Sequence, residues 1–511
     1  MKFASQRIEK TLPAWSKAAL CAVCTLLFFG VAYFVLYRGQ DLWHLWLPNA
    51  TNNDEVFYNR QLVRVLADGQ PRGVFGYNEQ RAHWGHFATW GPLVFYLYAL
   101  PGLLVGSGVN TMFWCNLLFA AAGWLVFAAG SALSWKRQLA FGLAVLAACM
   151  PLQLVFSGAA EGLHYGLVFC ILGGSCALRR GFHAGWYACL VAACGLETLL
   201  RAYTGVLWVF PLALLWPTRR RLACVTAGWA ALSLGGYFCL SRWFSAPYFS
   251  NSGVDLTAGK LLLRGQLTEA LSYTFTRLAL QFRYLWEGLI STSATAQPRQ
   301  QAVAFWLVTI LLVMAGFTVA WDLFRRPVVL RLLAMGCALT GQLAILLFYT
   351  TDSLVRHAML FFVLLLAALL IETRLAAAVV FCLLAMQLWL PYRRWAVPLP
   401  TYDAAMDCQL QTLQAALEQA EQQNQSEDPW DHTVAYDWTS QVFHGYLYGV
   451  PAGMGIQFDS SRYLASEETE IRSRFVITSR EGPVQDRLLR DGWTEWVATE
   501  DLVVYQRPEE G

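Results

Sequence analysis

The sequence predicts an all-α polytopic membrane bundle followed by a small C-terminal α/β soluble domain. Of the 511 residues, 57% are hydrophobic and only 14% are charged, and the mean hydropathy is +0.40. Several stretches can therefore reach the roughly 20 apolar residues that cross a bilayer as a helix. The charge also changes along the chain, because residues 392–511 hold 20 acidic residues and nine arginines without a lysine, whereas residues 1–391 are basic. We expect a membrane part at 1–391 and a soluble tail at 392–511.

Apolar runs mark the expected helices of the membrane part. They lie at about 17–36, 88–106, 110–131, 138–156, 162–178, 184–199, 202–216, 222–240, 302–322, 328–349, 355–371 and 375–391. Lys and Arg residues of short loops stay on the cytoplasmic side. In this chain all the basic loops lie on one side only if one of the apolar runs before residue 110 does not cross the membrane. The run at 88–106 contains Pro92, Pro101 and three glycines, so we expect it to lie at the membrane surface or to be re-entrant.

This choice leaves about eleven crossings, with the N-terminus in the cytoplasm and the tail outside a membrane that we expect to be a bacterial plasma membrane. The large outer loops are then 37–109 and 241–300. Three short outer turns are expected at 161–164, 197–201 and 352–357, and they can converge if the helices form a bundle.

The first outer loop contains the stretch DEVFYNRQLVRVLADGQ, with apolar residues at 56, 57, 62, 63, 65 and 66. This spacing predicts an amphipathic helix that lies on the membrane and ends near Gly69. Asp54 and Glu55 fall in its first turn. Two interpretations stay open: a helix cap, in which Glu55 pairs with Asn52 in a capping box, and a general base that accepts a proton from a hydroxyl or amine nucleophile.

Several motifs follow in a fixed layout. They are the aromatic and proline segment TWGPLVFYLYALPGLLVG, Glu161 in SGAAEGLHYGL, Arg201 between two apolar runs in GLETLLRAYTGVLWVFPLALL, and Arg356 in TTDSLVRHAMLFF. With the acidic pair after the first apolar run, this layout resembles the GT-C superfamily of polyprenyl-phosphate-dependent membrane glycosyltransferases. The superfamily includes protein O-mannosyltransferases, aminoarabinose transferases and the catalytic subunit of oligosaccharyltransferase.

The resemblance implies an inverting glycosyltransferase that moves a sugar from a polyprenyl-phosphate donor to an extracytoplasmic acceptor, which is a glycan, a lipid or a protein. It implies Asp54 as the general base, Glu55 and Glu161 as further catalytic acids, and Arg201 with Arg356 on the donor phosphate. Further substrate contacts are expected from Tyr58, His83, His86 and His164. Two departures stand out: Glu161 is alone where several families carry Asp or a paired motif, and the tail has no WWDYG motif.

Simpler interpretations remain for several of these residues. Arg201 can form a helical salt bridge with Glu197, four residues earlier. His83 and His86 in AHWGHF either hold a metal ion or belong to a turn, because their spacing is not that of the HExxH motif. His164 is equally consistent with a hydrogen-bonded bundle residue. No cofactor is identified, and a divalent metal stays open.

The tail begins with the helical pattern YDAAMDCQLQTLQAALEQAEQQNQ and continues with the strand-like runs HTVAY, RFVIT, WVAT and LVVYQ. It shows no glycine-rich phosphate loop, no Ser-His-Asp array and no nucleic-acid patch, so we expect it to bind an acceptor or to pack, and we expect no nucleic-acid partner. The other functions that the sequence allows are a lipid or solute transporter or flippase, and a polysaccharide polymerase or ligase. Membrane lipids are partners in every case.

Overall fold

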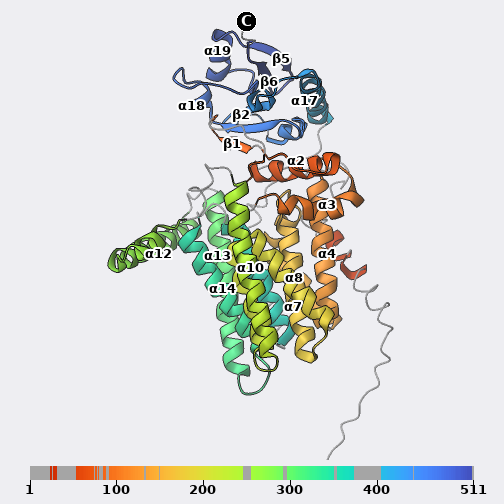
Figure 1. Ribbon diagram of the computed structural model, residues 1–511, viewed down its shortest axis with the longest axis vertical. Helices are drawn as coiled ribbons and strands as arrows, with labels where there is room; N and C mark the ends of the chain where they lie inside the picture. Colours follow the sequence, from red (N-terminus) through yellow and green to blue (C-terminus); the bar gives the residue numbers. More distant parts are fainter. Residues whose placement is uncertain are drawn as a thin grey trace, which may run out of the picture.

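The computed structural model describes residues 23–31, 53–131, 134–148, 150–245, 255–291, 296–349, 354–372 and 404–508, apart from residues 26, 74, 78, 80–84, 88–90, 441 and 443 within these ranges. Figure 1 shows a helical bundle, a layer of two helices across one end of it, and a small domain beyond that layer. The class predicted from composition is therefore present: a helical bundle with a small α/β domain after it.

The bundle is built from helices that run along its long axis (Figure 1). They are α4 (Thr111–Ser131), α5 (Trp135–Ala148), α6 (Met150–Val155), α7 (Glu161–Arg180), α8 (Ala184–Leu200), the 3-10 helix η1 (Ala202–Trp208), α9 (Val209–Leu215), α10 (Arg220–Phe244), α13 (Ala296–Asp322), α14 (Val329–Phe348) and α15 (Leu354–Glu372).

Six helices of the described chain are long and apolar enough to cross a membrane, namely α4, α7, α10, α13 from Arg299 onward, α14 and α15. The predicted run at 138–156 divides into α5 and α6, and α8, η1 and α9 are shorter apolar segments. The predicted crossing at 375–391 lies outside the described residues, and only 23–31 of the run at 17–36 lies within them. The protein is thus multi-pass by composition, while the number eleven stays a prediction.

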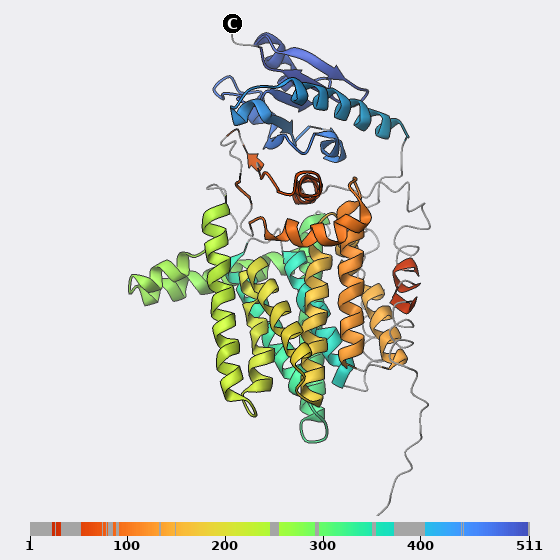
Figure 2. The same ribbon diagram turned by 45° about the vertical axis from the view of Figure 1, so that its right-hand side comes forward.

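The apolar run at 88–106 forms α3 (Leu93–Val105), which has 13 residues. A helix of this length spans about 20 Å, less than the hydrocarbon core of a bilayer. Figure 2 shows α3 lying across the end of the bundle, directly below α2. The expectation that this run does not cross agrees with its length and position.

The amphipathic pattern of the first outer loop forms α2 (Asn53–Asp68), and the predicted end near Gly69 is confirmed, since Gly69 has a positive φ of 77°. Its expected position on an open membrane surface is wrong. Residues 55–62 are all buried, because α3 covers one side of the helix and the tail covers the other (Figure 2). The polar residues Asn59, Arg60 and Gln61 are therefore enclosed by protein.

Glycines allow the close approach of α4 and α7. A Cβ on Gly123 would lie 2.4 Å from the Cα of Gly166, and a Cβ on Gly130 would lie 2.3 Å from the carbonyl oxygen of Gly173. Small residues at such crossings let helix backbones meet where a hydrophobic effect between helices is absent, as in a bilayer. This contact fixes the position of Glu161, the first residue of α7.

Basic loops meet at the end of the bundle opposite the tail. Arg179 pairs with Glu372, the Arg137 guanidinium donates to the Ile371 carbonyl at 2.6 Å, and Arg331 lies 3.1 Å from Asp322. The loops at 136–137, 179–180 and 325–326 therefore share one end, as the distribution of positive charge predicts.

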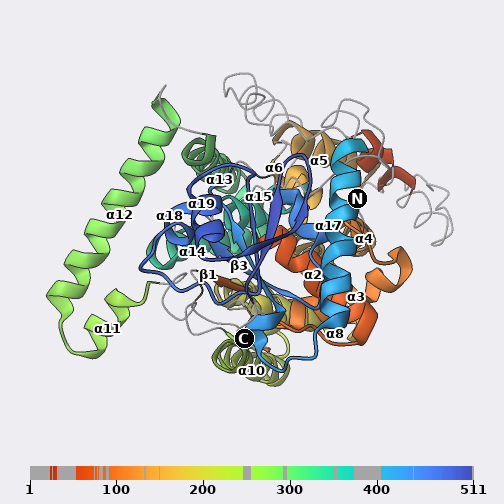
Figure 3. The same cartoon turned by 90° about the horizontal axis from the view of Figure 1, so that it is seen from above.

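The second outer loop forms α11 (Thr257–Leu263) and α12 (Leu267–Ile290). Figure 1 and Figure 3 show α12 projecting sideways from the bundle. Arg277 of α12 pairs with Asp255, and its guanidinium donates to the Tyr349 carbonyl at 3.0 Å, so the middle of α12 is tied to the end of α14.

The tail folds as an α/β domain with a six-stranded sheet in the order β1-β3-β2-β4-β6-β5. The pairs β1 with β3, β3 with β2 and β2 with β4 are parallel, and β6 with β4 and β5 are antiparallel. Its elements are α17 (Ala404–Gln423), η5 (Pro429–His432), β2 (Thr433–Asp437), η6 (His444–Gly449), β3 (Gly455–Asp459), α18 (Ser461–Leu464), β4 (Phe475–Thr478), α19 (Pro483–Arg490), β5 (Thr494–Ala498) and β6 (Val503–Gln506).

One strand of this sheet comes from the membrane part. β1 (Phe75–Tyr77) of the first outer loop pairs with β3, with Phe75 opposite Ile456. From α2, the buried guanidinium of Arg60 donates to the carbonyls of Leu447, Val450, Pro451 and Met454 in the tail. The first outer loop and the tail therefore form one structural unit.

Candidate active site

Three turns at the tail-facing end of the bundle bring charged residues together. Both carboxylate oxygens of Glu161 accept from the Arg201 guanidinium, from Nη2 to Oε1 at 2.6 Å and from Nη1 to Oε2 at 3.0 Å. The Nε of Arg356 donates to the same Oε1 at 2.8 Å. The three predicted outer turns thus meet, and Glu161, Arg201 and Arg356 form one cluster.

The alternative salt bridge between Arg201 and Glu197 is wrong. α8 ends at Leu200, and Arg201 has an extended backbone with φ −145° and ψ 106°, so its side chain leaves the helical track on which an i, i+4 pair would form. The Thr204 hydroxyl stabilises this break by donating to the carbonyls of Glu197 and Arg201 at 2.8 and 2.6 Å. The end of α8 therefore directs Arg201 toward α7.

Glu197 instead bonds His164, whose Nδ1 lies 2.8 and 2.9 Å from its two carboxylate oxygens. Both side chains are buried. His164 was expected either to contact substrate or to bond within the bundle, and in this structure it bonds within the bundle.

Tyr203 and His357 complete the cluster. The Tyr203 hydroxyl lies 2.6 Å from His357 Nδ1 and 3.4 Å from Arg201 Nη1. Sequence reasoning did not single out Tyr203, although it lies two residues after Arg201 in the same turn. Its nearness to Arg201 in the sequence is the feature from which its place in the cluster could have been predicted.

The central group joins one carboxylate to two guanidinium groups. Glu161 supplies one negative charge, while Arg201 and Arg356 supply two positive charges, and guanidinium groups stay protonated at physiological pH. Glu161 is fully buried, whereas the side chains of Arg201 and Arg356 keep 10% and 14% of their surface exposed. The two guanidinium groups are therefore the more accessible members of the group at the tail-facing end of the bundle.

A second set of polar residues fixes the start of α7. Asn116 Nδ2 donates to the carbonyls of Ser157 and Ala159 at 2.9 and 2.6 Å, and the Gly162 amide donates to Asn116 Oδ1 at 3.1 Å. The Tyr98 hydroxyl donates to the same oxygen at 2.6 Å. α3 and α4 thus bond backbone groups that the helix end leaves without an intrahelical partner, which holds Glu161 in place.

α2 reaches this end of the bundle through Glu55. A Cβ on Gly158 would lie 2.9 Å from the Cβ of Glu55, so the glycine lets α2 approach the turn before Glu161. From the tail, Tyr448 lies near the same residue: burial raises the pKa of the Tyr448 hydroxyl, and the Glu55 carboxylate raises it further. Asp54 lies in the same first turn of α2.

The remaining predicted residues lie in other surroundings. Tyr58 is buried, and its ring centroid lies 5.8 Å from that of Phe95 on α3, so its ring packs between α2 and α3. His83 lies outside the described residues. The backbone of His86 borders Gly73, whose φ is positive. Among the described residues, no group of three or more His, Cys, Asp or Glu side chains has the arrangement of a metal site.

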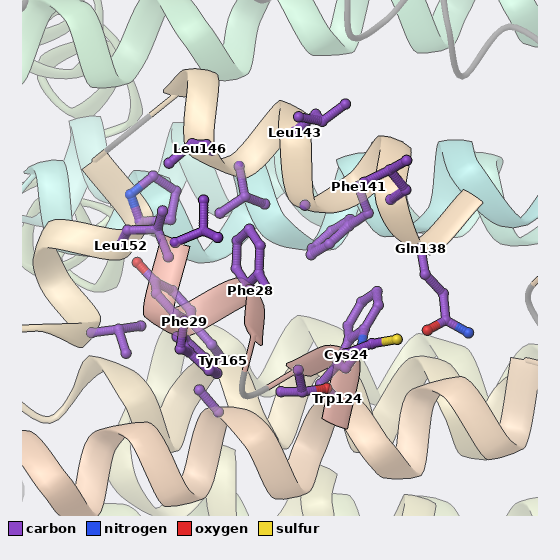
Figure 4. A pocket seen from close by; sticks show the side chains of 18 of the residues that line it. Cys24, Phe28, Phe29, Trp124, Gln138, Phe141, Leu143, Leu146, Leu152 and Tyr165 are labelled. Atoms are coloured by element: carbon purple, nitrogen blue, oxygen red, sulfur yellow. The ribbon is translucent and has the colours of Figure 1, made fainter. Parts of the chain in front are cut away.

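An apolar cavity of about 410 Å³ lies within the bundle beside α7. Figure 4 shows Phe28 and Phe29 from the N-terminal helix, Trp124 from α4, Phe141 from α5 and Tyr165 from α7 pointing toward it. Tyr165 lies one turn after Glu161 and its hydroxyl is buried without a hydrogen-bond partner within the described part of the chain. The cavity thus begins one helical turn from the charged cluster.

No family model matches the chain, and no curated protein matches it. Among solved structures, it is similar to the archaeal oligosaccharyltransferase AglB from Archaeoglobus fulgidus in complex with an inhibitory peptide and a dolichol-phosphate, with 11% identity and a TM-score of 0.46 over 93% of this chain and 70% of that chain. The apo form of the Archaeoglobus fulgidus oligosaccharyltransferase gives 11% identity and a TM-score of 0.47 over 91% of this chain and 69% of that chain.

A third similar structure is ArnT from Cupriavidus metallidurans bound to undecaprenyl phosphate, with 14% identity and a TM-score of 0.40 over 96% of this chain and 98% of that chain.

Proposed function

We propose that this protein is an inverting membrane glycosyltransferase that moves a sugar from a polyprenyl-phosphate donor to an acceptor on the extracytoplasmic side. The observation that supports the proposal is the convergence of two guanidinium groups, those of Arg201 and Arg356, on the buried Glu161 at the end of the bundle covered by α2. Guanidinium groups bind phosphate oxygens in a forked geometry, and a phosphate at this end would belong to a lipid or a soluble ester.

The apolar cavity favours a lipid. Its lining is almost entirely hydrophobic, and it runs along α7 from Tyr165, near the charged cluster, to the region of Gln138 at the start of α5. An isoprenoid chain is the substituent that such a lining would stabilise, by removing apolar surface from water. The donor phosphate would then lie at Arg201 and Arg356 with its chain between the helices.

In this proposal the acceptor hydroxyl or amine loses its proton to the carboxylate of Asp54 and attacks the anomeric carbon of the donor sugar. The bond from that carbon to the phosphate oxygen breaks, and the polyprenyl phosphate leaves with the electron pair. Arg201 and Arg356 would stabilise the charge that develops on the leaving phosphate. A single displacement of this kind inverts the anomeric centre.

Glu161 has a positioning role in this scheme. Both of its oxygens accept bonds from guanidinium groups, and a carboxylate so occupied is a weak proton acceptor. Its negative charge instead orients the two arginines. Asp54, and Glu55 beside it, remain the candidates for the base, because α2 comes to the turn before Glu161 at Gly158.

The test measures donor binding and transfer with the full-length protein in detergent or nanodiscs. Arg201→Lys should retain part of the affinity for a polyprenyl-phosphate sugar, whereas Arg201→Gln should weaken it by roughly tenfold to a hundredfold, the scale of a lost charge-assisted hydrogen bond of ~1.5–3 kcal/mol. Arg283→Gln is the matched control, since Arg283 is an exposed arginine paired with Glu287 on α12.

Two outcomes would contradict the proposal. If Arg201→Gln lowers the melting temperature but leaves the donor affinity of the folded protein unchanged, the arginine is only a structural partner of Glu161. If reconstituted protein moves the intact lipid-linked sugar across a bilayer and forms no glycosidic bond with any acceptor, the protein is a flippase.

A further inference from the structure

The tail contains a polar cavity of about 630 Å³ that the reaction at the bundle does not use. It lies between η5, the segment that leads into β4 and the end of β6. Its lining consists of Asn424, Asp428, Trp430, Asp431, Glu470, Arg472, Arg474, Gln506, Arg507 and Pro508. Its size lies in the range of small-molecule sites.

The walls of this cavity are held together without a ligand. The Arg474 amide donates to the Trp430 carbonyl at 3.2 Å, and the Arg507 amide donates to the Arg474 carbonyl at 2.9 Å. The Trp430 amide donates to Asp428 Oδ1 at 3.0 Å. Backbone bonds therefore join the three segments that form the walls and hold the Trp430 backbone, so a ligand would find the site formed in advance.

The charges of the lining argue against an anionic ligand. Three guanidinium groups face three carboxylates, and two of the arginines are neutralised within the cavity: Arg507 by Asp431 at 2.6 Å and Arg472 by Glu470 at 2.9 Å. The guanidinium of Arg474 donates to the Ala420 carbonyl at 3.3 Å. A phosphate or nucleic acid would need a surplus of positive charge, which these residues do not provide.

The same groups match a polyhydroxylated ligand. Carboxylates and amide oxygens accept hydrogen bonds from sugar hydroxyls, and guanidinium and amide N–H groups donate to them. Trp430 adds an aromatic ring, and the Arg472 guanidinium lies over one face of it, 5.7 Å from the ring centroid. The C–H face of a sugar ring would stack on the opposite face of the indole. Trp430 is half-buried. An indole offers both an apolar ring and a polar N–H group, and this combination is typical of aromatic residues in recognition sites.

We propose that this cavity binds a saccharide, and that in the transfer reaction proposed above the saccharide is part of the acceptor. The acceptor role rests on the proposed transfer reaction. Saccharide binding to the cavity does not depend on that reaction. The tail would then hold the acceptor while α2, which the tail clamps through Arg60, presents its first turn to the donor.

The experiment measures binding of free di- and trisaccharides of glucose, galactose, mannose and N-acetylglucosamine to the full-length protein, by saturation-transfer difference NMR, without donor lipid. At least one saccharide should bind, and Trp430→Ala should weaken it by about tenfold or more, equivalent to ~1.4 kcal/mol. Trp438→Ala is the matched control, because Trp438 is a 48% exposed tryptophan elsewhere on the tail; this variant should bind normally.

A second measurement separates this inference from the proposed function. Asp54→Asn should bind the saccharide normally, and Trp430→Ala should bind the polyprenyl-phosphate donor normally while raising the acceptor KM and leaving kcat unchanged. Saccharide binding by a protein that transfers no sugar would refute the proposed function and leave this inference standing.

Three results would overturn the inference. The first is that none of the saccharides binds the folded protein. The second is that Trp430→Ala and Trp438→Ala bind the saccharide equally well. The third is that inorganic phosphate, and none of the saccharides, binds to the residues of the cavity, which would identify an anion site.

Discussion

Arg201 shows how one backbone turn changes the partner of a charged residue. On a continuous helix it would face Glu197, and in the folded chain it bonds Glu161, 40 residues earlier. Removing one member of a buried ion pair leaves the other charge without compensation, which costs ~3–5 kcal/mol. Glu161 has two guanidinium partners, so loss of either arginine leaves the other in place.

Asp54 is the residue on which the proposed chemistry depends most. Asp54→Asn keeps a side chain that can cap the first turn of α2 but cannot accept a proton at neutral pH. Expression and melting temperature should stay nearly unchanged, while turnover should fall by roughly a hundredfold or more, as expected for a lost general base. Steady-state transfer assays with a lipid-linked sugar measure the effect.

Glu55→Gln is the companion variant and should cost less activity. Glu55 is buried and packs on Gly158, so its loss should appear mainly as a change in stability. Near-normal transfer by Asp54→Asn would show that the base lies elsewhere and would leave the acidic pair as a helix cap.

At the scale of elements, the contact between α4 and α7 determines where the cluster lies. A Cβ on Gly166 would lie 2.5 Å from the Phe119 carbonyl oxygen. The backbone of α4 or α7 would have to move to remove this steric clash. Gly166→Ala should therefore lower stability by about 1–3 kcal/mol, the usual cost of overpacking, and should reduce donor binding because Glu161 begins the same helix.

The control for this variant is Gly228→Ala. Gly228 lies in α10, where an added Cβ meets nothing within 4 Å, so the gain in helix propensity should raise stability by up to ~1 kcal/mol. Thermal unfolding followed by a thiol-reactive dye compares the two. Equal melting temperatures for both variants would mean that α4 and α7 are not in close contact.

Over the whole molecule, Glu79 joins the first outer loop to the tail. Its carboxylate accepts from the Arg472 and Ser473 amides, both at 3.0 Å, and from the Ser473 hydroxyl at 2.7 Å. Burial raises the pKa of Glu79 above its ordinary value of 4.5, although these hydrogen bonds act in the opposite direction.

A raised pKa means that the folded state holds the Glu79 proton more tightly than the unfolded state. The stabilisation from this group is therefore complete below pH 4.5 and is lost as the pH rises through the raised pKa. The difference in melting temperature between the wild type and Glu79→Gln should therefore become less favourable to the wild type as the pH rises from 4.5 through the raised pKa of Glu79. Exposed Glu481→Gln should show no such trend, and a flat difference for Glu79→Gln would contradict burial of this carboxyl group.

The basic loops predict the orientation of the whole chain in the membrane. In a background without the 13 native cysteines, Arg480→Cys on the tail should react with an impermeant thiol reagent in intact cells, and Arg220→Cys at the start of α10 should not. Both positions are exposed. Labelling of residue 220 alone would reverse the orientation, with the tail in the cytoplasm.

The sequence by itself determined the membrane class, α2 and its end at Gly69, and most strands of the tail. These features depend on residues close together in the chain, where hydrophobic periodicity and glycine or proline act over one or two turns. It missed β1 and β3, whose runs FGY and GIQFD are too short and too mixed to stand out from a loop.

Only the tertiary structure decided which charges meet. Arg356 bonds Glu161 across 195 residues, and Ser473 bonds Glu79 across 394. No local pattern encodes such pairs, because they depend on helix packing and on the backbone break at Arg201. The same holds for β1, since a strand with only three residues is stable only where another strand, here β3, supplies its hydrogen bonds.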